Sequence, residues 1–326
     1  MKDQFVTKKI LKWYDLNKRS LPWRKNVSSQ KRQFYTFVSE FMLQQTKVAT
    51  VIPYFNKFIK EIPNIKKLAS VDNKKLIKLW EGLGYYSRAR NLKKAAQAII
   101  KKFNGEIPDN FDDLKSLSGI GDYTANAILA IAFNKPYIPL DGNVERVLKR
   151  YLSLKKEREI QKDNLIQKKY ILGFSNRPSD YAQALMEFGA LVCKPKNPMC
   201  YQCPVTKKCK SFKKKDFNLT KSSKKHKDKY FILKVYKKNQ KYLLIKNTKF
   251  NFLKNLRIFP MEELHKPKKF NKDLNIKMSN MNMNIKILNL KNDKKFPSLY
   301  WIDQRKLNIY MLPTFTKKVV KYLERN

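Results

Sequence analysis

The stretch LKSLSGIGDYTANAILAIAF, residues 114–133, sets Gly119 and Gly121 between a short apolar segment and a longer apolar run. We expect that run to be a helix that begins near Asp122 or Tyr123. Glycines let the backbone approach a phosphate closely, and the free N–H groups of a helix N-terminus point toward it. The stretch therefore predicts a backbone site for phosphate, and an ordinary connection between two helices would fit the same letters.

Helical spacing extends over the first two thirds of the chain. Two stripes of apolar residues recur at steps of three and four, one in residues 48–62 and one in residues 89–103. Beyond residue 230 the period becomes two: residues 230–236 and 241–246 indicate a hairpin, and residues 281–287 alternate between apolar and polar. We predict a mainly α fold with a helical core over residues 1–210, a basic linker over 211–229 and a small α+β domain over 230–326.

The charge of the chain is strongly positive, with 72 Lys and Arg against 26 Asp and Glu and a formal net charge of +46. Such an excess favours a polyanionic partner, because neutralising phosphates releases condensed counterions. The alternative is that the excess of lysine has no functional meaning, because an A+T-rich genome encodes lysine, asparagine and isoleucine more often than other residues. The longest apolar run, residues 127–133, is far shorter than the ~20 residues that span a bilayer. We expect a cytoplasmic protein with no membrane partner.

All four cysteines lie in CKPKNPMCYQCPVTKKC, residues 193–209, as Cys193, Cys200, Cys203 and Cys209. In a reducing cytoplasm this close spacing indicates metal ligation rather than disulfides. Both histidines lie outside the segment. Four thiolates suit tetrahedral zinc or a four-iron cluster, and their spacing does not separate the two.

Three segments together resemble one family. LSGIGDYTANAI, PLDGNVERVLKR and the cysteine spacing are similar to the helix-hairpin-helix DNA glycosylases related to endonuclease III. The resemblance implies that the four cysteines ligate a [4Fe–4S] cluster in the loop 193–209, which presents basic side chains to DNA. VSEFMLQQTKVATVIPYF, LWEGLGYYSRARNL and LDGNVERV resemble the MutY-type adenine DNA glycosylases of this superfamily, which remove adenine mispaired with 8-oxoguanine or guanine.

The resemblance also implies the reaction type. Family members that cut the DNA backbone use a lysine amine to form a Schiff base, and Tyr123 occupies the matching position here. A phenol forms no imine, so we expect hydrolysis of the base alone, which leaves an abasic site.

Breaking an N-glycosidic bond calls for two carboxylates, one to protonate the base and one to stabilise the oxocarbenium sugar. Glu40 lies in the apolar helical segment FYTFVSEFML, where desolvation would raise its pKa, and it matches the family's general acid. Asp141 precedes a predicted helix, so a purely structural role as its N-cap would explain it. By the resemblance, Asp141 matches the family aspartate that stabilises the cation. Tyr123 and Asn143 match residues that position these carboxylates.

Base removal also requires extrusion of the base from the duplex. Gln44 and Tyr85 match residues that wedge into the base stack, and Arg19, Trp23 and Glu187 resemble residues of the adenine pocket. The C-terminal domain resembles the Nudix-like domain that reads the opposite base, although it has no acidic Nudix helix. Ser279 stands where the family has Phe-Ser-His, with Asn280 in place of histidine, so we expect weaker discrimination of 8-oxoguanine from guanine.

Two other functions fit parts of the sequence. One is a non-catalytic DNA-binding protein held together by zinc on the four cysteines, and the other is a glycosylase and lyase that acts on oxidised pyrimidines. For the favoured reading we expect a monomer, associated with the nucleoid, whose partner is double-stranded DNA containing an A:8-oxoguanine or A:G mispair.

Overall fold

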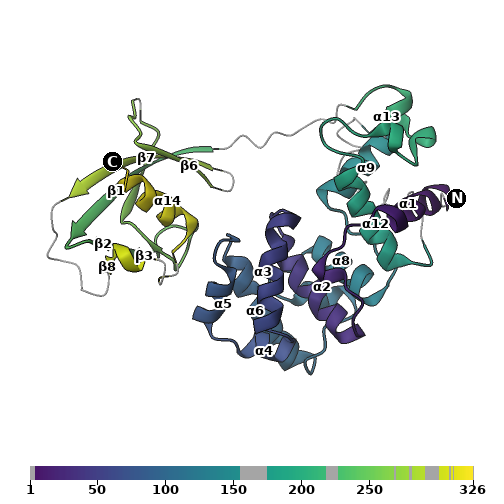
Figure 1. Ribbon diagram of the computed structural model, residues 1–326, viewed down its shortest axis with the longest axis horizontal. Helices are drawn as coiled ribbons and strands as arrows, with labels where there is room; N and C mark the ends of the chain where they lie inside the picture. Colours follow the sequence, from purple (N-terminus) through teal and green to yellow (C-terminus); the bar gives the residue numbers. More distant parts are fainter. Residues whose placement is uncertain are drawn as a thin grey trace. The chain divides into compact units, whose positions relative to one another are not determined.

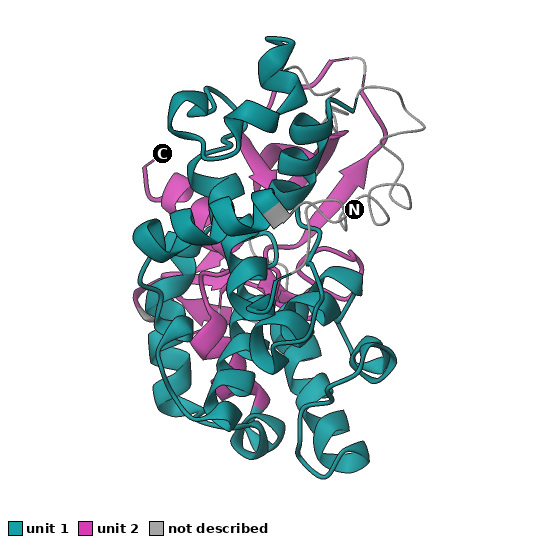
Figure 2. Cartoon of the chain, turned by 90° about the vertical axis from the view of Figure 1, so that its right-hand side faces the viewer, with its two compact units in different colours: residues 1–72, 87–221 teal, residues 73–86, 222–326 magenta. Residues whose placement is uncertain are grey.

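A computed structural model describes residues 4–154, 175–217, 227–267, 269–278, 281–290, 301–307, 310 and 312–325. The chain forms two compact units, residues 1–72 with 87–221 and residues 73–86 with 222–326 (Figure 2). The described elements of the first unit are helical, and all described strands belong to the second (Figure 1). The boundaries that we drew from the sequence, at residues 210 and 230, stay a prediction.

Helices build the first unit. They are α1 (Gln4–Asn17), η1 (Pro22–Arg24), α2 (Ser29–Leu43), α3 (Val48–Glu61), α4 (Ile65–Ser70), α6 (Ser87–Lys102), α7 (Phe111–Ser116), α8 (Asp122–Phe133), α9 (Gly142–Leu152), α12 (Pro178–Leu191), η3 (Cys200–Gln202), η4 (Thr206–Lys208) and α13 (Lys210–Lys213). The two apolar stripes predicted from the sequence are the buried faces of α3 and α6, where Phe55, Phe58, Leu92 and Ile99 are at most 2% exposed. In the described part of the chain, no helix combines the length and the hydrophobicity that a membrane span requires.

Helix α8 lies at the centre of this unit and begins at Asp122, as predicted. Its side chains are buried on nearly all sides, and it packs against α2 and α12. The turn from α7 to α8 contains Gly119 at a φ of +83°, a left-handed conformation that side chains disfavour. A β-carbon there would lie 2.8 Å from Asn91 Cβ and 2.9 Å from Phe41 Cε1. This turn, the hairpin of the helix pair α7–α8, is therefore held tightly against α2 and α6.

An apolar cluster in the same unit joins α1, α9 and α12. Fully buried residues from each helix meet there, among them Ile10, Val144, Leu148 and Leu185. The side chains of Cys193, Cys203 and Cys209 pack against this cluster. The cysteine loop is thus seated on the helices that precede it in the chain.

Strands dominate the second unit, which also contains α5 (Asn73–Trp80), η6 (Gln304–Lys306) and α14 (Thr314–Leu323). The strands are β1 (Lys227–Lys238), β2 (Lys241–Leu243), β3 (Ile245–Lys246), β4 (Arg257–Ile258), β5 (Met261–Leu264), β6 (Leu274–Met278), β7 (Met281–Leu290) and β8 (Trp301–Asp303). Their order in the main sheet is β6-β7-β1-β2-β8, with β5 paired to β1 and with β3 and β4 in a separate pair.

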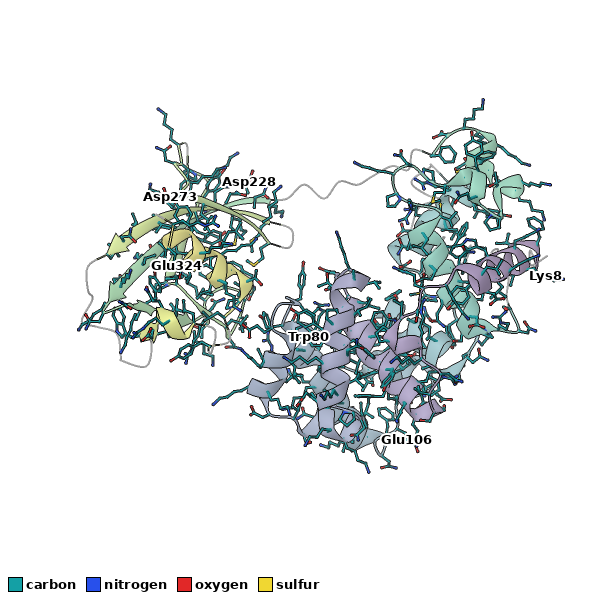
Figure 3. All side chains as sticks on the ribbon, in the orientation of Figure 1. Lys8, Trp80, Glu106, Asp228, Asp273 and Glu324 are labelled. Atoms are coloured by element: carbon teal, nitrogen blue, oxygen red, sulfur yellow. The ribbon has the colours of Figure 1, made fainter. Side chains whose placement is uncertain are left out.

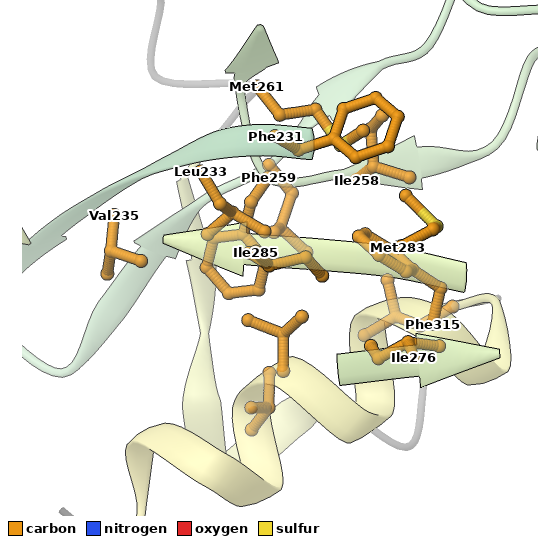
Figure 4. Close-up of a cluster of buried hydrophobic side chains, with 14 of the residues drawn as sticks. Phe231, Leu233, Val235, Ile258, Phe259, Met261, Ile276, Met283, Ile285 and Phe315 are labelled. Atoms are coloured by element: carbon orange, nitrogen blue, oxygen red, sulfur yellow. The ribbon is translucent and has the colours of Figure 1, made fainter. Parts of the chain in front are cut away.

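The predicted hairpin and alternating strand are both present, but the second arm of the hairpin ends at Leu243, and residues 245–246 pair with β4 instead. β1 and β2 are antiparallel with Lys238 opposite Lys241, and the two turn residues Asn239 and Gln240 both have positive φ, as a type I′ turn requires. β7 runs parallel to β1 and antiparallel to β6. Apolar residues of β1, β5, β6 and β7 point into one core, which Phe315 of α14 completes (Figure 4).

Candidate active site

A cavity of about 500 Å³ lies in the first unit, walled by α2, α8, α9, α12 and η1. The structure brings seven of the predicted site residues to its wall: Arg19, Trp23, Glu40, Tyr123, Asp141, Asn143 and Glu187. The segments that carry these residues are separated by up to 168 positions in the chain. One concave, partly polar site gathered from distant segments is typical of a ligand or active site.

Glu40 is 2% exposed, because the last turns of α2 are buried on all sides. Burial raises the pKa of Glu40 from 4.5 to about 7; the hydrogen bond from Tyr123 opposes the rise, and the charge of Asp141 adds to it. Within the described residues, its Oε2 atom has no hydrogen-bond partner. Near neutral pH this carboxyl group therefore carries a proton for part of the time, and the described residues leave Oε2 free to donate it.

Tyr123 supports this state of Glu40. Burial raises the pKa of its phenol well above 10, and the charges of Glu40 and Asp141 act in the same direction. The phenol therefore keeps its proton and donates a hydrogen bond to the Glu40 carboxyl group.

Asp141 is the N-cap of α9, as predicted. Its Oδ1 accepts hydrogen bonds from the backbone N–H groups of Asn143 (2.9 Å) and Val144 (2.7 Å), and its Oδ2 accepts one from Asn143 Nδ2 (2.9 Å). These donors lower the pKa of Asp141, but burial raises it by more, so the net shift is upward. The N-cap position, which is visible in the sequence, would by itself favour a lowered pKa.

The two carboxylates differ in their donors. Asp141 accepts three hydrogen bonds from N–H groups, whereas the hydrogen bond recorded for Glu40 comes from a phenol. Hydrogen-bond donors stabilise the charged form of a carboxylate, so a proton shared between Glu40 and Asp141 resides preferentially on Glu40.

Asn143 is fixed on its other side by Arg146. Arg146 Nη2 donates to Asn143 Oδ1 at 2.8 Å and to the Gly189 carbonyl at 2.6 Å. A β-carbon at Gly189 would lie 2.7 Å from Asn143 Cβ, so α12 can approach α9 this closely only with glycine there. The sequence analysis missed both Arg146 and Gly189.

An ion pair closes another part of the wall. Arg19 donates to both carboxylate oxygens of Glu187, at 2.8 and 2.6 Å, and Arg24 lies 3.1 Å from the same carboxylate. Glu187 is 1% exposed; burial raises its pKa, but the two guanidinium groups outweigh burial and the net pKa is lowered. Glu187 is thus a buried carboxylate that stays ionised.

The aromatic ring of Trp23 forms another part of the wall. It packs edge-on against Phe55, with the ring centroids 5.4 Å apart.

Several lining residues were not predicted, namely Arg24, Thr36, Lys47 and Gln183. Arg24 is adjacent to Trp23 in the sequence, which was a usable signal for it. The other three carry no local signal, because their side chains reach the cavity only through the packing of α2, α3 and α12.

The residues predicted to wedge into DNA fall in different parts of the chain. Gln44 ends α2, and its side chain donates to the Gly119 carbonyl (3.2 Å) and to Thr124 Oγ1 (3.3 Å). At Gly121, the N-cap of α8, an added β-carbon would meet nothing within 4 Å. Tyr85 is 41% exposed and belongs to the second unit, so its role beside Gln44 stays a prediction.

Ser279 and Asn280 lie outside the described residues, between β6 and β7 in the chain. The strand residues on either side of them, Met278 at the end of β6 and Met281 at the start of β7, are paired. The same hairpin is anchored at its far end by Asp273 (Figure 3), whose carboxylate accepts a hydrogen bond from the Ile287 N–H at 2.6 Å.

The four cysteines are free thiols that line one small cavity, of about 30 Å³, beside α9. Burial raises the pKa of Cys200 to about 11 and also raises those of Cys203 and Cys209. Arg150, 4% exposed, donates to the carbonyls of Lys194 (2.5 Å) and Pro195 (2.8 Å) and lies 3.6 Å from Cys193 Sγ. Among the described residues, no three Cys, His, Asp or Glu side chains form a site for a single metal ion. Four thiols around one cavity are a soft donor set that suits either zinc or an iron–sulfur cluster.

Known proteins resemble this chain in sequence and in fold. The family described as "HhH-GPD superfamily base excision DNA repair protein" matches residues 38–185. An adenine DNA glycosylase of Buchnera aphidicola subsp. Baizongia pistaciae is 41% identical over 240 residues, which cover 72% of this chain and 67% of that protein. An adenine DNA glycosylase of Rattus norvegicus is 41% identical over 209 residues, which cover 62% of this chain and 40% of that protein.

A solved thermostable thymine-DNA glycosylase is 26% identical, with a TM-score of 0.58 over 65% of this chain and 96% of that structure. An endonuclease III structure in a complex with DNA is 23% identical with a TM-score of 0.55 over 65% of this chain and 95% of that one, which shows the shared fold. Both the sequence relationship and the helical fold agree with the resemblance drawn from the motifs. This chain belongs to the MutY-type adenine DNA glycosylases of the HhH-GPD superfamily, and it is a DNA glycosylase of base excision repair.

Proposed function

We propose that this enzyme hydrolyses adenine from duplex DNA in which the adenine is mispaired with 8-oxoguanine or guanine, and that it leaves an abasic site. The observation that carries the proposal is the pair of carboxylates on one cavity: Glu40, with its pKa raised to about 7, and Asp141, capped by three N–H donors. Relatives at 36 to 41% identity named adenine DNA glycosylases support adenine as the substrate base. The net charge of +46 favours DNA as the partner.

The cavity supports recognition of the extruded base. Its volume of about 500 Å³ accommodates a purine, and Trp23 supplies an aromatic surface in the wall. Glu187 stays ionised beside its two arginines, so it can accept hydrogen bonds from the exocyclic amino group of adenine. A base without that amino group would not make this hydrogen bond and would therefore bind less tightly than adenine.

The chemistry follows from the two carboxyl groups. Oε2 of protonated Glu40 donates its proton to a ring nitrogen of adenine, and the electrons of the C1′–N bond leave with the base. The Asp141 carboxylate stabilises the oxocarbenium charge that develops on the sugar. Water then adds to C1′ and releases a proton, which the Glu40 carboxylate takes up, so Glu40 is ready for another turnover.

The experiment that tests this proposal is single-turnover excision from a duplex with one A:8-oxoguanine pair, with a fully paired A:T duplex as the control. We expect strand cleavage only after alkali or heat, which break abasic sites. Excision at equal rates from both duplexes would contradict a mispair-specific enzyme.

The competing lyase function has a specific test. Tyr123 replaces the lysine of the bifunctional enzymes, but one lysine among the described lining residues, Lys47, offers an amine to the cavity. Borohydride should trap little covalent adduct with DNA. Efficient trapping that Lys47→Ala abolishes would establish the lyase function instead.

We propose that Cys193, Cys200, Cys203 and Cys209 hold a [4Fe–4S] cluster. When bound, the cluster cross-links the loop and adds no glycosidic chemistry; Arg150 offsets its negative charge. The purified protein should be brown and contain about four irons and four sulfides per chain. One zinc and no sulfide would support the Cys₄ zinc protein. Adenine excision by the wild-type protein that Glu40→Gln abolishes would then still identify an enzyme, whereas a non-catalytic DNA-binding protein would excise no adenine in either form.

We propose that residues 230–326, the strand-containing part of the second unit, are a Nudix-like domain that reads the base opposite adenine through the segment containing Ser279. Its sheet, flanked by α14, supports the α+β part of this proposal. Because Asn280 replaces the family histidine, we expect the ratio of excision rates on A:8-oxoguanine and A:G to be small and Asn280→His to raise it. A large ratio in the wild-type protein would refute the weakened discrimination. The monomeric state and the location at the nucleoid stay predictions.

A further inference from the structure

Arg88 is a buried cation in the first turn of α6, only 6% exposed. Its Nη1 atom lies 3.2 Å from the carbonyl oxygen of Phe41, 2.7 Å from that of Met42 and 2.5 Å from that of Gln44. Burying a guanidinium group is unfavourable unless strong acceptors surround it, so these contacts define where the side chain must lie.

The three carbonyl groups belong to the C-terminal end of α2. There the carbonyl oxygens have no N–H partner within the helix and carry the negative end of its dipole. The Arg88 guanidinium group therefore caps α2, which is also the helix that carries Glu40. No residue of α2 supplies this cap, because its last turn contains no basic side chain.

The backbone changes direction at the same place. Gln44 leaves the helical conformation with φ −54° and ψ 110°, and Gln45 adopts a left-handed φ of 57°. A non-glycine residue in that region is disfavoured, so surrounding contacts must hold it there. The carbonyl group of Gln44 belongs to the peptide bond between these two residues. The hydrogen bond that it accepts from Arg88 is therefore such a contact.

The side chain of Gln44 is held from the opposite side. Its amide reaches the Gly119 carbonyl and Thr124 Oγ1 across the hairpin before α8. Arg88 thus fixes the backbone of Gln44 while the hairpin fixes its side chain. A group that is preset in this way loses less conformational entropy when DNA binds.

We propose that Arg88 is a positioning residue that presets Gln44 for extrusion of the target base. The inference rests on the proposed function, in which Gln44 enters the base stack. It assigns the role to a residue that is not among those that line the cavity. Lysine would not replace it, because Nη1 makes all three contacts and the lysine ammonium nitrogen lies one bond closer to the main chain, so it falls short of the same position.

A double-mutant cycle tests the proposal with Arg88→Lys, Gln44→Ala and the double variant, in single-turnover excision on the A:8-oxoguanine duplex. We expect each single substitution to slow excision about ten-fold and the double variant to be no slower than Gln44→Ala, because coupled residues are not additive. The pH midpoint of the rate should stay that of the wild type. Lys94→Ala, which removes an exposed cation from the same helix, is the matched control and should leave the rate unchanged.

A second measurement separates extrusion from chemistry. With 2-aminopurine beside the target adenine, binding of the wild-type protein should raise the fluorescence as the stack opens, and binding of Arg88→Lys should raise it less. If Arg88→Lys does not fold, Arg88→Gln, which keeps N–H donors without the charge, takes its place in both experiments.

Additive slowing in the double variant, about a hundred-fold, would mean that Arg88 acts independently of Gln44 and would overturn the proposal. Wild-type rates and fluorescence for Arg88→Lys would overturn it too. If the wild-type protein releases no adenine, the proposed function fails, and the fluorescence comparison on the mispaired duplex still decides the role of Arg88.

Discussion

Glu40→Gln removes the proton that we assign to adenine while it keeps the size of the side chain. The amide oxygen of the variant would still accept the hydrogen bond from Tyr123, so the cavity wall should retain its shape. General acid catalysis by a positioned side chain contributes about 10²- to 10⁴-fold, and we expect adenine excision to slow by that factor. Binding to the mispaired duplex should remain, because Glu40 is buried and contributes no surface charge.

The pKa of about 7 sets the pH dependence of the wild-type enzyme. The active form is protonated, so the rate should be level below pH 6 and fall as the pH rises through about 7, to about a tenth at pH 8. In Glu40→Gln the residual rate should lack this fall. Single-turnover rates from pH 5.5 to 8.5 measure both curves.

Stability should change in the opposite direction to activity when Glu40 is replaced. Since the folded state raises the pKa of Glu40 from 4.5 to about 7, ionisation of this group lowers the free energy of unfolding as the pH rises through that window. The difference amounts to about 3 kcal/mol at pH 8. Glu40→Gln, which never ionises, should therefore be more stable than the wild type by about 3 kcal/mol at pH 8 and nearly equal to it at pH 4.

Urea unfolding at the two pH values measures this difference. Glu145→Gln is the matched control, because Glu145 is partly exposed, pairs with Lys149 on α9 and does not line the cavity. An inactive variant with raised stability at pH 8 would separate loss of the proton donor from misfolding. Wild-type excision by Glu40→Gln, or a wild-type rate that rises with pH, would refute the reasoning.

Other substitutions test other parts of the site. Asp141→Asn keeps an N-cap but loses the charge, so excision should fall about 10²- to 10³-fold while the free energy of unfolding changes by less than about 1 kcal/mol; equal losses of both would contradict the cation-stabilising role. Gly119→Ala, forced into a left-handed conformation and against Asn91, should lose about 2 kcal/mol of stability in urea unfolding. Gly121→Ala, in open space, should lose below about 1 kcal/mol, and equal losses would refute the packing argument. Glu187→Gln leaves two arginines without their counter-charge and should destabilise the protein by about 2 kcal/mol, since Arg19 is 36% exposed and partly screened; an unchanged urea midpoint would show that the ion pair contributes nothing.

Local patterns were sufficient to predict several elements of the fold. The apolar stripes gave α3 and α6, the glycines placed the start of α8 at Asp122, and the change to a period of two gave β1, β2 and β7. The direction of the pKa shift of Glu40 was also predictable, because the apolar residues around it in its segment indicate a helix that is buried there. The family resemblance supplied the residues that share the cavity, which spacing along the chain could not.

Tertiary packing decided the rest. Arg19 and Glu187 are 168 residues apart, and Thr36, Lys47 and Gln183 reach the cavity only because α2, α3 and α12 meet there. The capping contact of Arg88 joins α6 to α2 in the same way. The pKa of Asp141 shows the limit most directly: its N-cap position, visible in the sequence, lowers the pKa, and burial by other helices raises it by more. Hydrogen bonds at a helix terminus depend on neighbouring residues in the chain, whereas desolvation depends on every element packed around a group, so the sequence determined the first and only the tertiary structure decided the second.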